Sequence, residues 1–274
     1  MSPSPLAIVL AAGKGTRMGS DLPKVLHDAA GKPLVTWVLD ALGAAGCPDQ
    51  IVVVGHAADS VRDTVGGRPG VRFALQEQQR GTGDAVRAAA DLIREACRDE
   101  AESRRPVVIV CGDSPLLRPE SVTGLLEAFA EASAACLLGT AVTADPTGLG
   151  RIVRDDTGRF LRITEEKDAT AAERAIREVN MSTYVFAAAK LLESLDRLNT
   201  ENAAGEYYLT DCPRLLLEAG EEVAAVACLD PSETLSVNTP AQLAAVSEAL
   251  AARQGIASPN RPATLEPGPL RGVG

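Results

Sequence analysis

The sequence predicts an α/β fold in which helices cover both faces of a mostly parallel sheet, giving three layers. Short apolar runs, which are typical of buried strands, alternate with segments of helical periodicity. Strands and helices alternate in this way when helices connect parallel strands. A chain of 274 residues is long enough for one large α/β domain or two small ones.

In the first half of the chain, an apolar or β-branched run predicts each strand, and an apolar face or a high alanine content predicts each helix. Within residues 33–45, for example, Leu34, Val38 and Leu42 share one helical face. Residues 84–97 are alanine-rich, which favours one helix. The expected strands are 6–10, 51–54, 71–75, 106–111 and 135–142, and the expected helices are 33–45, 59–65, 84–97 and 118–133.

The second half has a different pattern, which we interpret as a substrate-side insertion followed by a return to the sheet. A hairpin is expected around the turn Asp155–Gly158. The last residues, 258–274, are rich in proline and glycine, which predicts a disordered tail. The expected strands are 151–154, 159–163, 183–187 and 222–228, and the expected helices are 171–177, 206–219 and 240–252.

Composition narrows the class of protein. A net charge of −10 argues against a nucleic-acid partner. No apolar run approaches the roughly 20 residues of a membrane span, and the N-terminus lacks the basic segment of a signal peptide. The six cysteines form no C-x-x-C pair, which favours buried thiols in a reducing cytoplasm. With only two histidines, any metal is expected to be a hard cation on oxygen ligands.

The segment that follows the first strand predicts a nucleoside triphosphate site. Residues 11–19, AAGKGTRMG, offer small residues that let backbone N–H groups approach an anion. Arg17 and Lys24 bring two cations to the same loop. The glycine spacing excludes the dinucleotide fingerprint, and the ATPase phosphate loop does not occur. A simple tight turn is the alternative, but it leaves the two cations unexplained.

Gly112 and Asp113 end the strand 106–111, and ligands of open α/β sheets lie beyond the carboxyl ends of the strands. We therefore expect Asp113 to hold Mg²⁺ near the phosphates. The alternative is an aspartate that caps a helix or a turn. Asn238 precedes Thr239 and Pro240, a plausible N-cap and first helical residue, and its amide oxygen is a second candidate metal ligand.

Other polar segments are more ambiguous from the residues alone. Gln76 and Gln79 carry both donors and acceptors, as recognition of a nucleobase requires, and Gly81 permits close approach. The same segment could be a polar loop with a helix cap at Thr82 or Asp84. The charged run 165–168 is usually a solvated face, and Asn180 is equally open to either interpretation.

The motifs AAGKGTRM, LPK, QRGTGDA, GDSPLL, DPTGLGRI, EEKDAT, GEYYLTD and SVNTP occur in this order. Over residues 5–250 the chain thus resembles the uridylyltransferase domain of the bacterial bifunctional N-acetylglucosamine-1-phosphate uridyltransferases, within the sugar nucleotidyltransferase superfamily. The resemblance implies a Rossmann-like α/β/α fold with a mostly parallel mixed sheet, of the nucleotide-diphospho-sugar transferase type. It also implies that UTP and N-acetylglucosamine 1-phosphate give UDP-N-acetylglucosamine and pyrophosphate, with Mg²⁺.

The resemblance also implies roles for individual residues. Arg17, Lys24 and Asp113 would be catalytic, with Arg17 and Lys24 on the phosphates, and Asp113 and Asn238 would ligate Mg²⁺. Gly150, Glu165 and Asn180 would hold the amino sugar. The expected substrate-binding residues in full are Leu10, Ala11, Ala12, Gly13, Lys24, Gln76, Gln79, Gly81, Thr82, Gly112, Gly150, Glu165, Asn180 and Asn238.

The resemblance implies one nucleotidyltransferase domain over residues 1–254. Its nucleotide-binding half is expected at about 1–145 and its sugar-binding half at about 146–254, with a disordered tail at 255–274. The hexapeptide repeats of the family's left-handed β-helix do not occur, so we expect no such domain and no acetyl transfer. Trimerisation in the family relies on that domain, which leaves the oligomeric state open.

Two further departures concern the sugar site. Cys111 stands where the family has an aromatic residue, and Met181-Ser182 stands where it usually has Thr-Gly. Another sugar 1-phosphate or another nucleoside triphosphate is therefore an alternative substrate. A non-catalytic sugar-nucleotide sensor is a second alternative, but such a protein could lose Arg17, Lys24, Asp113 and Asn238, all of which are present here.

Overall fold

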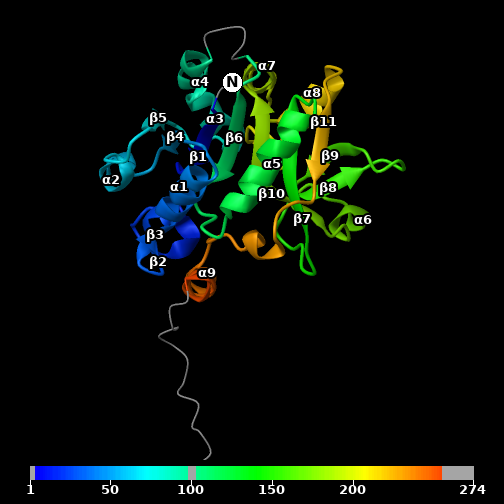
Figure 1. Ribbon diagram of the computed structural model, residues 1–274. Helices are drawn as coiled ribbons and strands as arrows, with labels where there is room; N and C mark the ends of the chain where they lie inside the picture. Colours follow the sequence, from blue (N-terminus) through cyan, green and yellow to red (C-terminus); the bar gives the residue numbers. More distant parts are fainter. Residues whose placement is uncertain (1–3, 98–102, 255–274) are drawn as a thin grey trace, which may run out of the picture.

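The computed structural model describes residues 4–97 and 103–254 (Figure 1). The predicted tail lies outside these residues. Within them, nine strands form one sheet and two short strands form a small hairpin. The strands are β1 (Leu6–Leu10), β2 (Asp28–Ala29), β3 (Lys32–Pro33), β4 (Asp49–Val54), β5 (Val71–Leu75), β6 (Pro106–Cys111), β7 (Cys136–Val142), β8 (Arg151–Arg154), β9 (Phe160–Thr164), β10 (Glu178–Ala187) and β11 (Val223–Val226).

The main sheet is mixed and mostly parallel, as predicted. Its order is β11-β7-β10-β6-β1-β4-β5, and the β8–β9 hairpin extends from β10. β1 lies between β4 and β6 and is parallel to both. β10 is antiparallel to its neighbours β6 and β7. The carboxyl ends of β1 and β6 therefore meet at one edge of the sheet. The described residues contain no left-handed β-helix.

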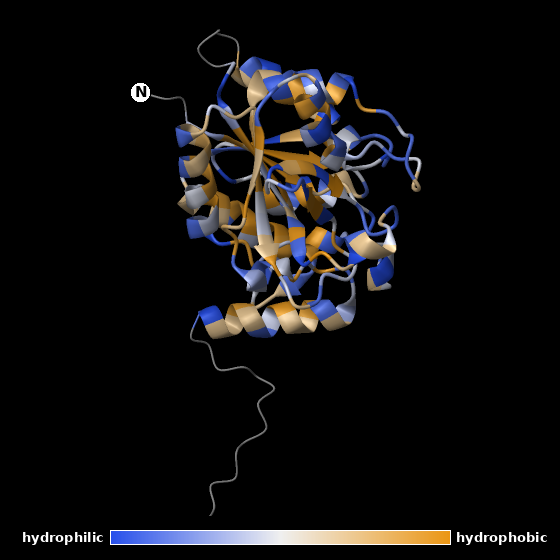
Figure 2. Cartoon of the chain, turned by 90° about the vertical axis from the view of Figure 1, so that its right-hand side faces the viewer, coloured by the Kyte–Doolittle hydropathy of each residue, from blue (hydrophilic) through white to orange (hydrophobic). Residues whose placement is uncertain are grey.

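Helices cover both faces of the sheet because the side chains of its central strands alternate between two apolar cores. In β1, Leu6 and Ile8 face one core, and Ala7 and Val9 face the other. Figure 2 shows these strands as an apolar interior with hydrophilic residues on the outer surfaces of the helices. The helices are α1 (Leu34–Ala44), α2 (Ala58–Val65), α3 (Thr82–Ala88), α4 (Ala90–Ala96), α5 (Pro119–Glu131), α6 (Ala171–Arg174), α7 (Ala188–Asp196), α8 (Cys212–Glu218) and α9 (Pro240–Arg253).

Helices α3, α4, α7 and α8 contribute to the first core, whereas α1, α2 and α5 contribute to the second. The three-layer prediction is thus confirmed. Helix α9 belongs to neither layer. It packs through Val246 and Leu250 onto a smaller apolar cluster that includes Ala29 of the β2–β3 hairpin. Thr239 caps α9 by accepting a hydrogen bond from the Gln242 amide, as predicted.

One predicted helix is interrupted in the structure and another begins late. The helix expected at 84–97 is divided into α3 and α4 at Ala89, although the alanine-rich sequence contains no helix breaker. Both parts bury residues in the first core, so tertiary packing rather than propensity accounts for the division. The helix expected at 206–219 begins late, with a short 3-10 helix, η4 (Leu209–Asp211), before α8. Tyr207 instead pairs through its backbone with Arg80 and Gly83.

Other boundaries shifted as well. The helix expected at 171–177 is only the single turn α6, which is closed at its start by the Thr170–Glu173 capping box. β10 is ten residues long, twice the predicted 183–187, because it crosses an irregularity between Asn180 and Thr183. Helix α7 was not predicted, since it follows β10 directly and has no side-chain N-cap to mark its start.

The predicted hairpin at β8 and β9 is confirmed, and the Gly158 amide closes its turn on the Asp155 carbonyl. Three of the six cysteines, Cys47, Cys136 and Cys212, are buried. None of the described helices combines the length and the apolar character that a membrane crossing would need.

Candidate active site

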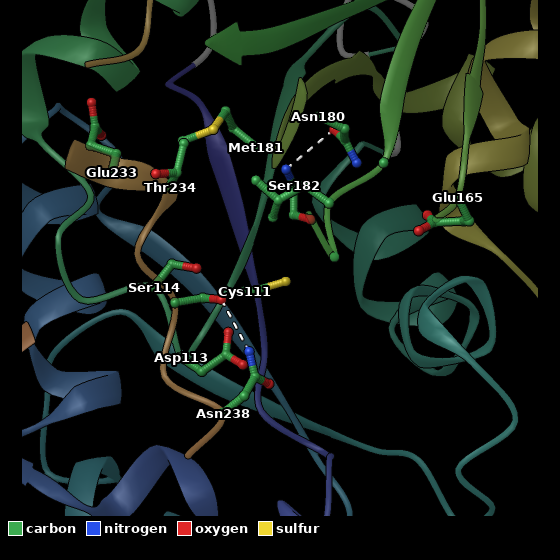
Figure 3. Close-up of a pocket in the computed structure, with 14 residues that line it drawn as sticks. Cys111, Asp113, Ser114, Glu165, Asn180, Met181, Ser182, Glu233, Thr234 and Asn238 are labelled. Atoms are coloured by element: carbon green, nitrogen blue, oxygen red, sulfur yellow. Dashed lines mark hydrogen bonds between the residues drawn. The ribbon is translucent and has the colours of Figure 1, made fainter. Parts of the chain in front are cut away.

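Two cavities of about 260 and 220 Å³ adjoin at the carboxyl ends of β1 and β6. Cys111 and Asp113, at the end of β6, line both cavities and so form their common wall. We call the larger one the nucleotide-side cavity and the smaller one the sugar-side cavity, after the groups that the sequence motifs lead us to expect in each. Figure 3 shows the sugar-side cavity, with Asp113 and Asn238 at one end and Glu165 on the opposite side.

The nucleotide-side cavity brings together predicted residues from the first strand, the glycine-rich loop and the loop after β5. Its wall contains ten of the predicted site residues, together with Val25, Ala85, Cys111 and Glu206. The ten are Leu10, Ala11, Ala12, Gly13, Lys24, Gln76, Gln79, Gly81, Thr82 and Asp113.

The loop after β1 has the close backbone approach that its glycines predict. Gly15 lies in the left-handed region at φ 63°, and a Cβ there would lie 2.5 Å from the Cβ of Lys24. Glycine therefore lets the loop pack directly against Lys24. A Cβ on Gly13, in contrast, would meet no atom within 4 Å, so its backbone borders open space that a ligand could fill.

Gln76 is the most constrained polar side chain of this cavity. It is buried, and its Nε2 donates to the Gly81 carbonyl at 3.1 Å and to Asp84 Oδ2 at 2.9 Å. Both partners are acceptors, so the orientation of the Gln76 amide follows from the hydrogen bonds. Its Oε1 accepts no hydrogen bond from the described residues, and it is therefore available as an acceptor for a ligand.

Gly81 and Thr82 contact the segment that carries the GEYYLTD motif. The Thr82 hydroxyl accepts a hydrogen bond from the Leu209 amide at 3.1 Å, and the Gly83 amide donates to the Tyr207 carbonyl at 2.8 Å. Thr82 is the first residue of α3 and makes no side-chain cap, and Asp84 lies inside the first turn. The alternative of a cap at either residue is therefore wrong, because Gly81 precedes the helix.

Four predicted residues meet where the two cavities join. The Lys24 ammonium forms an ion pair with Asp113 and donates to Asn238 Oδ1 at 3.0 Å. Arg17 Nη2 donates to the same Asn238 oxygen at 2.8 Å. These side chains come from η2 (Lys24–Leu26), the end of β6, the loop before α9 and η1 (Thr16–Met18). The tertiary structure thus places two cations beside the two predicted metal ligands.

The donor set suits Mg²⁺. Asp113 and Asn238 direct a carboxylate oxygen and an amide oxygen at one point, where the Lys24 ammonium now provides the positive charge. Oxygen ligands of this kind are the ones that Mg²⁺ prefers, and it usually takes its remaining ligands from waters and substrate phosphates. The described residues hold no group of three or more histidine, cysteine or acidic side chains that could form an all-protein metal site.

The sugar-side cavity contains Asp113, Gly150, Glu165, Asn180 and Asn238 of the predicted residues. Glu165 Oε1 accepts a hydrogen bond from the Thr210 hydroxyl at 3.0 Å. Burial raises the pKa of the Glu165 carboxyl, and the Thr210 hydrogen bond offsets part of that rise. A carboxylate that is partly desolvated in this way is a strong acceptor for a ligand hydroxyl.

A buried arginine holds the wall beside Glu165. Arg151 is 1% exposed, and it pairs with Glu166 at 2.7 Å while also donating to the Leu149 carbonyl. Glu166 accepts a second hydrogen bond, from the Gly148 amide at 3.1 Å. The charged run 165–168 is therefore not simply a solvated face, because Glu165 lines the cavity and Glu166 fixes the loop that ends at Gly150.

Cys111 lies in the common wall and does not resemble a nucleophile. Burial, together with the Asp113 charge, raises the pKa of its thiol to about 12. The thiol is therefore uncharged at neutral pH. The neighbouring Ser182 hydroxyl makes a polar contact with it, which opposes that rise. Both departures from the family pattern thus meet on one side of the sugar-side cavity.

Two predicted residues line neither cavity. Within the part of the chain that the structure describes, Arg17 reaches the site only through Asn238. The Gly112 amide donates to the Leu10 carbonyl at 2.9 Å, and a Cβ would lie 3.1 Å from that oxygen, so Gly112 lets β1 and β6 approach closely behind the wall. Conversely, Glu206, Glu233, Thr234 and Ser236 line the cavities without having been predicted. Glu206 and Ser236 lie in the quoted motifs GEYYLTD and SVNTP, which was the available signal.

The profile of the MobA-like NTP transferase domain matches residues 7–223, most of the described chain. The chain belongs to this family. The match covers both cavities except for the segment around Asn238, and it confirms the predicted family and a nucleotidyltransferase-type domain.

Curated relatives agree with the family. The chain is 48% identical over 238 residues to the "Bifunctional protein GlmU" of Geobacter metallireducens and 49% identical over 260 residues to that of Sorangium cellulosum. These alignments cover 87% and 92% of this chain but 48% and 53% of the relatives. The protein of the same name from Brevibacillus brevis is 46% identical over 237 residues. The chain thus spans about half the length of the curated relatives it matches.

Proposed function

We propose that this chain is a sugar-1-phosphate uridylyltransferase that makes UDP-N-acetylglucosamine and pyrophosphate from UTP and N-acetylglucosamine 1-phosphate. The observation that carries the proposal is the pair of adjoining cavities with the cluster of Lys24, Asp113 and Asn238 between them. A transferase that joins two substrates needs two sites that open onto one reacting point. The family and its GlmU relatives support the same reaction class.

Gln76 supports UTP as the nucleotide. Its free carbonyl oxygen is suited to accept a hydrogen bond from the N3–H of uracil, whereas the N3 of cytosine is itself an acceptor. An unpaired donor or acceptor in a buried site weakens binding substantially. In this proposal residues 1–145 form the nucleotide-binding half and 146–254 the sugar-binding half, with Glu206 as a contribution of the second half to the first cavity.

The reaction requires no side-chain nucleophile. The phosphate oxygen of the sugar phosphate is already anionic, and it attacks the α-phosphorus of UTP while pyrophosphate leaves from the opposite side. The enzyme's task is to hold two anions together, so positioning and charge neutralisation provide the catalysis. Arg17 stabilises charge on the leaving pyrophosphate, and Lys24 moves from Asp113 to the phosphates. The neutral thiol of Cys111 takes no chemical part.

Asp113 and Asn238 would hold Mg²⁺, which neutralises phosphate charge when it is bound. In the free protein the Lys24 ammonium balances the Asp113 carboxylate, so the pair is not left as an uncompensated charge. Glu165 accepts a hydrogen bond from the sugar. Glycine is needed at position 150 because a Cβ there would lie 2.9 Å from Ile163 Cγ2.

Pyrophosphate release tests the proposal. Purified protein is mixed with Mg²⁺, UTP and N-acetylglucosamine 1-phosphate, and parallel reactions contain glucose 1-phosphate or each of the other three nucleoside triphosphates. Release that is strongest with UTP and the N-acetylated sugar supports the proposal. Strong release with a different pair reassigns the substrate, as Cys111 and Ser182 in the sugar-side cavity would allow.

A sugar-nucleotide sensor is the second candidate, and it predicts binding of a UDP-sugar without any pyrophosphate release. The convergence of Arg17, Lys24, Asp113 and Asn238 argues against it, because a sensor does not need charged residues gathered where the two substrates would react. Three further statements remain predictions from the sequence: that this chain transfers no acetyl group, that it lacks nucleic-acid partners and that it acts in the cytoplasm.

A further inference from the structure

Ser182 has a backbone conformation that L-amino acids avoid. Among the described residues, three that are not glycine have a positive φ: Ala30 at 51°, Ala57 at 50° and Ser182 at 51°. Ala30 lies in the turn between β2 and β3, and Ala57 precedes α2. Ser182 lies inside the ten-residue strand β10. A left-handed residue within a strand is strained and persists only where its surroundings hold it.

A β-bulge and a buried polar network hold Ser182 in place. The register of β10 against β7 shifts between Asn180 and Thr183, which is the bulge. Asn180 Oδ1 accepts a hydrogen bond from the Ser182 amide at 3.2 Å (Figure 3). Asn180 Nδ2 donates to the Tyr184 hydroxyl at 2.7 Å. Asn180 and Tyr184 are only 5% and 2% exposed. The bulge is therefore a built feature of the strand.

The bulge places Ser182 on the wall of the sugar-side cavity. Ser182 lines that cavity with Cys111 and Met181, and it does not line the nucleotide-side cavity. Bulges commonly redirect a side chain next to an active site. Glycine would adopt the same backbone conformation without strain, so the backbone alone gives no reason for a serine here. What serine adds is a hydroxyl that both donates and accepts hydrogen bonds.

We propose that Ser182 is a specificity-determining residue for the sugar phosphate, held in a strained conformation so that its hydroxyl bonds to a hydroxyl or amide group of the sugar. This inference rests on the proposed uridylyltransferase function, which it deepens. The oxygen of the Asn180 side chain already accepts a hydrogen bond from the Ser182 amide. Asn180 therefore positions Ser182 in addition to lining the cavity.

Two substitutions separate the hydroxyl from the strain. In Ser182→Gly both are removed, so we expect the Tm to rise by about 2–4 °C and the KM for the sugar phosphate to rise about 5–10-fold. In Ser182→Ala only the hydroxyl is removed, so we expect the same rise in KM without the rise in Tm. The KM for UTP should stay within about twofold in both variants, because Ser182 is absent from the nucleotide-side wall.

Ala30→Gly is the matched control, since it relieves a nearly identical φ in a turn that lines neither cavity. It should raise the Tm and leave both KM values unchanged. An unchanged KM for the sugar phosphate in active Ser182→Gly would overturn the Ser182 proposal alone. Equal rises in both KM values would do the same. A wild-type protein that releases no pyrophosphate would refute the proposed function itself, and the sugar-binding role of Ser182 with it.

Discussion

The two cavities are built in different ways. The wall of the nucleotide-side cavity comes mainly from two local segments, the loop after β1 and the loop after β5. Within each segment, the residues that line the cavity are close together in the sequence. The wall of the sugar-side cavity comes from five separate places between Cys111 and Asn238, including the bulge in β10 and the loop fixed by Arg151. A site made of local segments leaves a recognisable motif, whereas a site made of distant segments depends on the fold to assemble it.

Asp113 belongs to both walls, so its substitution should have the largest effect. Asp113→Asn removes the carboxylate that pairs with Lys24 and is proposed to hold Mg²⁺. We expect kcat to fall by about 10²–10³-fold, because charge neutralisation at the reacting point is lost. Steady-state pyrophosphate release measures this. Asp59→Asn, on the exposed start of α2, is the control, and near-normal turnover in Asp113→Asn would contradict the metal assignment.

Substitution of Lys24 tests whether a cation binds at the junction between the two cavities. Removing its ammonium in Lys24→Met frees Asp113 from its ion pair and removes one of the two cations that donate to Asn238 Oδ1. The free protein should then bind Mn²⁺ about tenfold more tightly, as measured by electron paramagnetic resonance of free Mn²⁺, although catalysis falls. Arg17→Met removes a cation that contacts Asn238 but makes no ion pair with Asp113. Equal Mn²⁺ affinities in the two variants would show that the Lys24 ammonium does not occupy the proposed cation site.

The nucleotide-side cavity should discriminate less between nucleotides when a hydrogen bond that orients Gln76 is removed. Asp84→Leu removes one of the two acceptors that orient the Gln76 amide. We expect the preference for UTP over CTP, expressed as a ratio of kcat/KM values, to fall about tenfold. Asp84→Asn keeps an acceptor oxygen and should stay within about twofold of wild type. If both variants discriminate like the wild type, the anchoring argument is wrong.

The sugar-side wall should show a pH-dependent gain in stability when Glu165 is neutralised. Burial raises the pKa of this carboxyl in the folded state, so the stability it contributes is present below its ordinary pKa of 4.5 and is lost as pH rises through the folded pKa. Glu165→Gln avoids that loss. We expect its Tm to exceed the wild type by about 1–3 °C at pH 7 and to match it near pH 4.

The same variant should bind the sugar phosphate more weakly, because an amide replaces a carboxylate acceptor. Thr210→Val removes the hydrogen bond to Glu165 and serves as the comparison. It should leave the carboxylate in the cavity and make the stability depend more strongly on pH than in the wild type, because the hydrogen bond that lowers the pKa of Glu165 is lost. A stability gain in Glu165→Gln that is the same at both pH values would show that titration of this carboxyl is not its cause.

The sequence by itself determined the layers of the fold and most of the nucleotide-side wall. Alternating apolar residues in β1 necessarily face two cores, and the glycine-rich loop must follow the strand to which it is joined. Gln76 and Gly81 lie within six residues, so their proximity needed little from the rest of the chain. The five strands expected in the first half agree with β1, β4, β5, β6 and β7 to within two residues at each end, whereas the short strands β2 and β3 were not predicted.

Only the tertiary structure decided the features that depend on distant contacts. The break between α3 and α4 occurs in a sequence that favours a continuous helix, and residues 206–208 are not helical because Tyr207 pairs with Arg80. Lys24 and Asn238 are 214 positions apart, yet they share a hydrogen bond. Local propensity carries no information on such contacts. The strained Ser182 also arises in this way, since a bulge is a mismatch between two strands and neither sequence contains it alone.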